Sequence, residues 1–169
     1  MRIPLLKKLG MMTACLLLTA TAARAQKTTE ILWDNYGVPH VYGATENDMY
    51  YAFGWAQMHN HANLLLKLYG QARGRAAEYW GEQYVASDKQ IHLFNLPETA
   101  RQTYAKNKGA DKARLDAFVN GDNAYARAHP EALDPAMKQV LPVTAPDVLA
   151  HTARVLCLEF LAGEDIQNV

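Results

Sequence analysis

The chain has 169 residues, of which 50% are hydrophobic, and its 17 basic and 17 acidic residues balance to a formal net charge of zero. Without a basic stripe, the composition argues against a nucleic-acid partner, and after residue 25 no apolar segment is long enough to span a membrane. Cys157 is the one cysteine beyond residue 25, so an internal disulfide is excluded there.

Residues 1–25 are typical of a cleavable secretory signal. A positively charged start precedes an apolar run over 9–20, which is too short to cross a bilayer. Small residues at Ala23 and Ala25 suit signal cleavage, and they predict a mature chain that begins at Gln26.

A lipoprotein signal ending at Cys15 is the alternative. It is disfavoured because the apolar run continues through Leu18, which leaves too little apolar sequence before the cut. The mature region 26–169, roughly 144 residues, is enough for one modest domain. Export without disulfides favours a bacterial periplasmic location.

Residues 31–42 predict a β-hairpin. An apolar run over 31–33 is followed by a turn and by a second run with alternating side chains. Gly37 can adopt a positive φ, and Asp34 or Asn35 can bond the turn backbone. Pro39 removes a backbone donor, which suits an edge position or the start of a strand.

The rest of the chain is predicted to be mostly helical. Thr45 as N-cap, with Asp48 in the capping-box position, begins a helix that runs to about Leu68. The segments expected after it are a turn and short helix over 73–81, a loop-rich stretch over 82–96, a helix opening near Pro97, a helix over 111–129 and a last helix over 146–161.

Two strands alone do not form a stable sheet in water, and their open edges call for a partner strand from elsewhere. This pattern indicates that the chain is one part of a larger assembly.

The residues that could carry chemistry do not combine into a catalytic centre. His59 and His61 are two apart on a predicted helix and point in different directions, so surface or half-buried histidines are favoured over a zinc site. Ser87 is the one serine after residue 25 and lacks a G-x-S-x-G turn, while Cys157 lies in an apolar run typical of an inert core thiol.

Three segments in order, 36–42, 50–58 and 71–81, resemble the start of the penicillin acylase family, which holds penicillin, cephalosporin and acyl-homoserine-lactone acylases. They read YGVPHVY, YYAFGWAQM and QARGRAAEYWG. One departure is His59, because the family usually has Asp or Glu soon after its A-Q pair, and Met58 is inserted into that pattern.

The resemblance implies a precursor that cuts itself into a small α chain and a large β chain. It makes 1–25 the signal peptide and 26–169 the α-chain region. The expected fold class is α+β, with a mostly helical α chain whose short N-terminal β-hairpin joins the αββα N-terminal nucleophile hydrolase sheet of the β chain. The implied activity is hydrolysis of the amide of small N-acyl compounds by a serine at the β-chain N-terminus, outside this chain, with no cofactor for catalysis.

The resemblance also implies site residues on the last helix. Leu156 and Phe160 fall on positions that face the acyl pocket, and they lie four apart on one helix face. Ordinary core packing is the alternative for both. Glu159 stands where acylases that hold a β-lactam carboxylate have an arginine, so it favours an uncharged leaving group.

Many family members bind a structural calcium ion through a glutamate near the end of the α chain. Glu164, with Asp165 beside it, is the nearest candidate ligand, and a solvated acidic helix end is the alternative. Two hypotheses from other classes stay open, a stand-alone periplasmic helical binding module and a truncated fragment without function.

Overall fold

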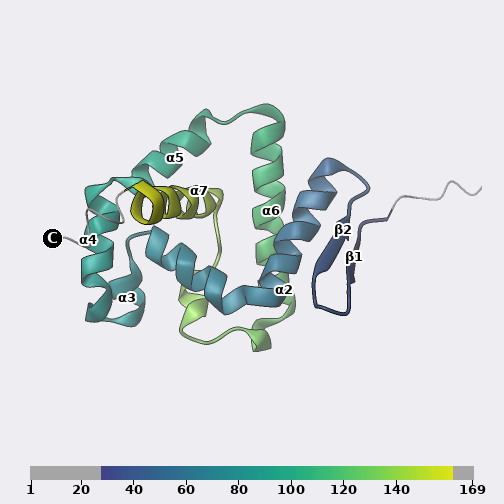
Figure 1. Ribbon diagram of the computed structural model, residues 1–169, viewed down its shortest axis with the longest axis horizontal. Helices are drawn as coiled ribbons and strands as arrows, with labels where there is room; N and C mark the ends of the chain where they lie inside the picture. The colour runs from purple at the N-terminus through teal and green to yellow at the C-terminus, as the bar shows by residue number, and fades with distance from the viewer. Residues whose placement is uncertain (1–27, 162–169) are drawn as a thin grey trace, which may run out of the picture.

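A computed structural model describes residues 28–161 of the chain. A two-stranded hairpin is followed by helices, as the sequence predicts (Figure 1). Among the described residues, no helix combines the length and apolar character that a membrane crossing requires.

The hairpin pairs β1 (Glu30–Trp33) with β2 (Pro39–Tyr42) in antiparallel register, with Ile31 opposite Val41. Asp34 Oδ1 closes the turn by accepting hydrogen bonds from the backbone N–H groups of Tyr36 (2.8 Å) and Val38 (3.0 Å). Gly37 has φ = 77°, a region that favours glycine. The predicted hairpin and its turn are confirmed.

The long helix α2 (Glu46–Ala72) begins as predicted. Thr45 and Asp48 bond each other's backbone N–H groups in a reciprocal capping box. The backbone leaves helical geometry at His61 (φ −142°, ψ 31°), and α2 bends sharply there (Figure 1). No residue pattern around His61 predicted this bend.

The prediction of a loop-rich stretch over 82–96 is wrong. A short 3₁₀ turn, η1 (Glu82–Tyr84), leads into α4 (Val85–Leu93). Tertiary contacts hold this helix, because Asp88 accepts hydrogen bonds from the first N–H groups of α3 (Ala76–Trp80), and His92 bonds the Gly74 carbonyl at 2.9 Å. The sequence over 82–96 has only a weak helical periodicity, and it does not indicate these hydrogen bonds to distant residues.

The later helices lie close to their predicted places. They are α5 (Leu96–Lys106), α6 (Gly109–Ala128), the short 3₁₀ turns η2 (Pro130–Ala132) and η3 (Met137–Val140), α7 (Ala145–Arg154) and η4 (Val155–Leu161). One helix was predicted over 146–161, whereas the structure changes from α-helix to π-helix at Val155. Such wider turns are rare and often occur at functional sites.

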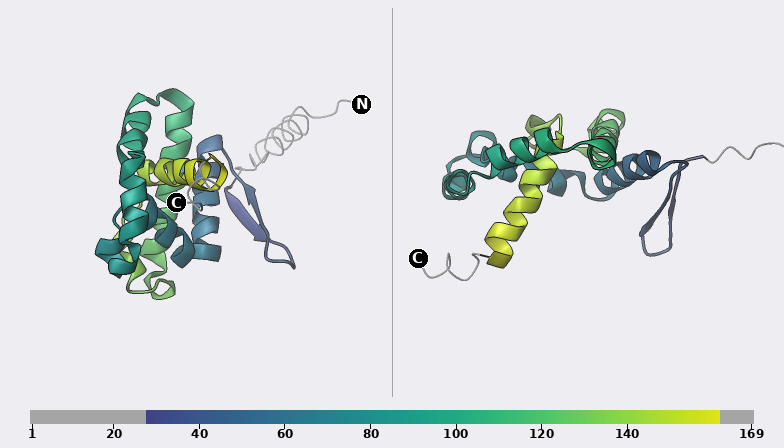
Figure 2. Two further views of the ribbon diagram at one scale, coloured as in Figure 1. Left: turned by 60° about the vertical axis from the view of Figure 1, so that its left-hand side comes forward. Right: turned by 90° about the horizontal axis from the view of Figure 1, so that it is seen from above.

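Helices α2 to α6 form a layer from which two elements project. The hairpin leaves one end of the layer, and the last helical segment leaves it from between α2 and α5, both on the same side (Figure 2, right). The main core lies inside the layer, around Met58, Leu66 and Val140.

Helices α2 and α6 cross with their backbones in near contact. A Cβ built on Gly54 would lie 2.1 Å from the carbonyl oxygen of Phe118, and one on Gly121 would lie 2.0 Å from that of Tyr51. Neither distance is sterically possible, so both helices need glycine at the crossing.

Asp122 is buried completely beside this crossing. Neither of its carboxylate oxygens has a hydrogen-bond partner. The nearby Tyr69 hydroxyl lowers the pKa of Asp122, but by less than burial raises it. Burial raises the pKa of Asp122 to about 8. The carboxyl group is therefore held largely neutral at pH 7.

Gly54→Ala should destabilise the protein by about 1–3 kcal/mol, since the added methyl forces the helices apart. Helix propensity alone would favour alanine by about 1 kcal/mol. Urea unfolding measures the difference, with Asn120→Ala on the exposed side of α6 as the control. Stability equal to or above that of the unmodified protein would rule out the tight crossing.

Asp122→Asn should change the pH dependence of stability. The native pKa lies above the ordinary value of about 3.9, so the native state of the unmodified protein holds a proton that the unfolded state has lost. Its stability relative to the variant should therefore fall as pH rises from about 4 to 8, and the difference should then level off. Thermal unfolding midpoints across this range test it, with exposed Asp111→Asn as control; parallel curves for Asp122→Asn would contradict it.

Candidate functional site

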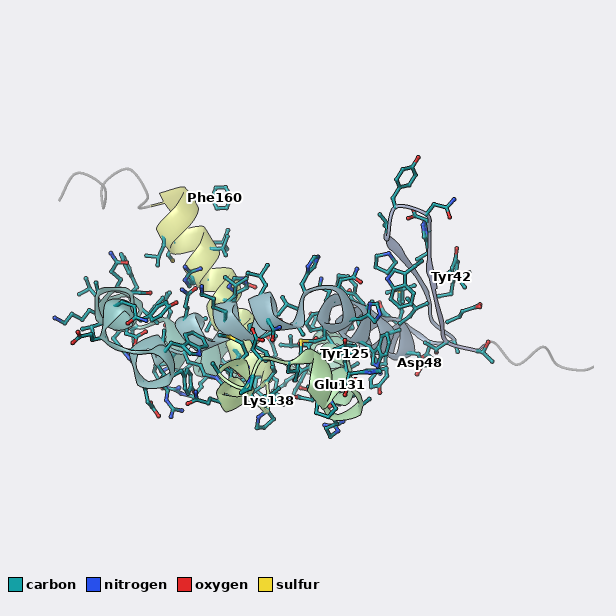
Figure 3. All side chains as sticks on the ribbon, turned by 90° about the horizontal axis from the view of Figure 1, so that it is seen from below. Tyr42, Asp48, Tyr125, Glu131, Lys138 and Phe160 are labelled. Atoms are coloured by element: carbon teal, nitrogen blue, oxygen red, sulfur yellow. The ribbon has the colours of Figure 1, made fainter. Side chains whose placement is uncertain are left out.

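The candidate site is the side of the layer flanked by the hairpin and by η4, here called the open face. Figure 3 shows both projections rising from the layer, with the ring of Phe160 on the side of η4 that faces the hairpin. Tyr42 lies on the hairpin, at the other end of the layer.

The hairpin docks on α2 through one of its two faces. The Trp33 indole N–H donates to Asn60 Oδ1 at 3.3 Å, and the Trp33 ring packs 4.7 Å from that of His59. On its other face Leu32 is 49% exposed and Tyr42 is 55% exposed. Within residues 28–161 the sheet has only these two strands, so both outer edges lack a neighbouring strand.

The π-helix η4 presents large apolar side chains to solvent. Leu156 is 52% exposed and Phe160 is 75% exposed. Inside the described part of the chain, neither is a core residue. Their role in substrate binding stays a prediction.

A largely buried ion pair, in which the Asp147 side chain is 8% exposed and that of Arg73 17% exposed, fixes the start of α7. Arg73 Nε and Nη2 donate to the two carboxylate oxygens of Asp147 at 2.8 and 2.7 Å, and Nη2 also bonds the Pro142 carbonyl. Burial lowers the pKa of Arg73, but its hydrogen bond and charge attraction to Asp147 outweigh burial and hold the pKa above its ordinary value. Arg73 is thus a permanent cation in a two-pronged contact.

Two further sets of hydrogen bonds hold Val143 and Thr144, the residues that precede α7. Asp147 Oδ2 accepts from the backbone N–H and the hydroxyl of Thr144, both at 2.7 Å, in a second capping box. From α6, the Asn123 side-chain amide bonds both the N–H (2.9 Å) and the C=O (2.8 Å) of Val143.

Further along α7, His151 packs against Tyr69 of α2, with ring centroids 5.9 Å apart. Its Nδ1 is buried without a hydrogen-bond partner. Burial, and then the charge of Arg154, lower the pKa of His151. The ring is therefore neutral near pH 7 and serves to pack α7 on α2.

Several residues singled out from the sequence do not meet here. The side chain of Glu159 and all of Glu164 and Asp165 lie outside the described residues, as does the predicted signal region 1–25. Among the described residues, Ser87 has no bond to a histidine, and no three His, Cys, Asp or Glu side chains are grouped to hold a metal ion. Cys157 is half-buried.

Sequence reasoning missed the residues that orient α7, namely Arg73, Asn123 and Asp147. One signal was available, because Thr144 and Asp147 repeat the Thr45 and Asp48 spacing that begins α2. No local pattern indicated the partner of Asp147, since Arg73 lies 74 positions away.

Arg73→Gln should cost about 3–5 kcal/mol of folding stability, because it leaves the Asp147 carboxylate buried without its cation. Arg75→Gln is the matched control: its pair with Glu78 is exposed, so the loss should stay below about 1 kcal/mol. Denaturant unfolding of both variants gives the comparison. Equal losses would show that burial of the Arg73 pair adds nothing.

Comparison with known proteins adds to this geometry. The chain is 26% identical over 121 residues to penicillin G acylase from Escherichia coli, covering 70% of this chain and 14% of the relative. It is 24% identical over 99 residues to the acyl-homoserine lactone acylase QuiP from Pseudomonas fluorescens, covering 59% of this chain and 12% of the relative. The chain thus spans about one seventh or less of the length of these relatives.

The fold also matches a solved structure, the thermostable penicillin G acylase from Alcaligenes faecalis. The TM-score is 0.68 at 24% identity, with 79% of this chain and 74% of that chain covered. A sequence profile described as penicillin amidase matches residues 28–164. The sequence motifs, the hairpin and helical layer, and this profile agree, and the chain belongs to the penicillin amidase family.

Proposed function

We propose that the chain is the small-subunit part of an exported amidohydrolase that cleaves the amide bond of small N-acyl compounds. The compounds are penicillin- or cephalosporin-type β-lactams or N-acyl-homoserine lactones, in line with the names of the relatives. The large subunit of the same precursor supplies the catalytic serine, and the enzyme works in the periplasm.

The open face is the observation that carries the proposal. Both projections expose apolar side chains of a size that proteins normally bury, including Phe160 and Tyr42. The hairpin adds two unpaired strand edges at the same face. A large partner that continues the sheet and packs between the projections would cover all of these groups.

The lengths of the matched chains support a subunit of this size. The matched chain of the Alcaligenes structure is close in length to this one, since the alignment covers 79% and 74% of the two. The aligned part of the Escherichia coli relative is only 14% of that protein. Another relative, penicillin acylase 2 from a Pseudomonas strain, is named a proenzyme.

The catalytic groups are assigned to the β chain because the described residues do not supply them. Residues 28–161 contain no serine or cysteine bonded to a base, so the proposed nucleophile is the β-chain serine. Its own α-amino group, with a pKa of about 8, takes the hydroxyl proton as the oxygen adds to the amide carbonyl. Hydrogen-bond donors of the β chain stabilise the oxyanion, and the α-ammonium group passes its proton to the leaving nitrogen as the C–N bond breaks. Water then attacks the acyl-enzyme, giving its proton to the α-amino group, and releases the acid and the free serine hydroxyl.

Expression of the complete reading frame tests the proposal. Two chains should appear after processing, and the product should hydrolyse phenylacetyl, glutaryl or long-chain acyl amides. Residues 26–169 expressed alone should be inactive. Activity of that short chain by itself, or a reading frame with no large segment after Val169, would refute it and favour a stand-alone binding module.

Phe160→Ala should shift the preference for acyl-chain length towards bulkier acyl groups, since a large apolar side chain at the proposed pocket wall is removed. The ratio of kcat/KM for long-chain and short-chain amides should change by about tenfold or more. Leu93→Ala removes an equally accessible apolar side chain from α4 and should leave the ratio unchanged. An unaltered ratio in the Phe160 variant would remove this residue from the pocket.

Glu159→Arg should favour substrates whose leaving group carries a carboxylate. The new cation would attract that group, where glutamate repels it, so kcat/KM for β-lactams should rise relative to neutral lactones. Glu131→Arg, an exposed change of the same charge in η2, is the control. If both variants give the same relative rates, Glu159 does not face the leaving group.

A further inference from the structure

A cavity lies apart from the residues predicted to bind substrate. It has a volume of about 470 Å³ and opens between α3, α5 and the start of α7. Neither Leu156 nor Phe160 lines it. This volume falls in the range of small-molecule sites.

The cavity offers no free carboxylate to a cation. Asp147 is the one carboxylate among its lining residues, and its oxygens already accept two bonds from Arg73 and two from Thr144. A carboxylate with four donors is saturated. The Pro142 carbonyl is likewise occupied by Arg73.

Donors are in surplus at the same place. Arg75 donates through Nε and Nη2 to Glu78 (2.7 and 2.6 Å), and Arg101 donates through the same two atoms to Glu98 (3.0 and 2.8 Å). A guanidinium has five N–H groups, so each arginine keeps unused donors. Both side chains are at least half exposed, and both line the cavity.

The Tyr79 hydroxyl adds one more donor, because it accepts a bond from Arg73 Nη1 and keeps its own proton for a ligand. Gln139 and Thr144 also line the cavity, and its apolar part is formed by Pro97, Leu141, Pro142, Pro146 and Ala150. The lining therefore combines cationic donors with a rigid apolar surface.

We propose that this cavity binds a small organic carboxylate with a compact apolar body. Arg75 and Arg101 hold the carboxylate, the guanidinium fork being matched to that group. The apolar body rests on the proline-rich wall. Glu78 and Glu98 pair with the same two guanidinium groups and partly neutralise their charge, so they limit the affinity.

Fluorine NMR titration of the full-length protein with 4-fluorobenzoate tests the proposal. Arg75→Gln and Arg101→Gln should each weaken binding by about fivefold or more, since each removes charge-assisted hydrogen bonds. Glu98→Gln and Glu78→Gln should tighten binding, because they remove the charges that partly neutralise the two guanidinium groups. Arg127→Gln, an exposed cation of α6 that does not line the cavity, is the matched control and should change nothing.

Two further ligands separate charge from shape. 4-Fluorobenzyl alcohol, which keeps the body without the charge, should bind far more weakly, and inorganic phosphate should compete poorly. The proposal is overturned by absence of binding, by equal effects of Arg75→Gln and Arg127→Gln, or by phosphate competing as well as benzoate. Unfolding midpoints confirm that each variant is folded, and the opposite signs expected for the arginine and glutamate variants exclude a general loss of structure. The test does not depend on the proposed amidase activity.

Discussion

The two-pronged pair between Arg73 and Asp147 links the end of α2 to the start of α7 and so fixes where the last helix leaves the layer. The hairpin docks on the middle of the same helix α2, through Trp33 on His59 and Asn60. One bent helix therefore sets both borders of the open face. The bend at His61 lies between these two attachments and determines how they face each other.

The buried carboxylates divide into two kinds. Asp88 and Asp147 lie beside helix starts, where each accepts hydrogen bonds from backbone N–H groups. Asp122 lies inside the core without donors, and low polarity there favours its neutral form. Asp88 and Asp147 therefore fix the positions of helices. The burial of Asp122 instead costs folding free energy, which the packing of α2 on α6 must offset.

Local signals predicted much of the fold. The hairpin turn, the Thr45 capping box, the short helix closed by Gly81 and the helix near Pro97 all depend on neighbours a few positions apart. Helix α4 was missed because bonds from Asp88 and His92 to distant backbone hold it. Of the site, the sequence indicated Leu156 and Phe160 through family resemblance, but the anchors of α7 depend on contacts as far as 74 positions apart, which spacing does not encode.

The uncovered edges of the hairpin have a consequence for biosynthesis. Such edges, beside exposed aromatic rings, are templates for pairing with another copy of the chain and so for aggregation. If the covering partner is part of the same polypeptide, its local concentration is of the order of millimolar, and intramolecular docking outcompetes association between copies. Making both subunits as one precursor would thus protect the small subunit until it is covered, so cleavage that preceded docking would forfeit this protection.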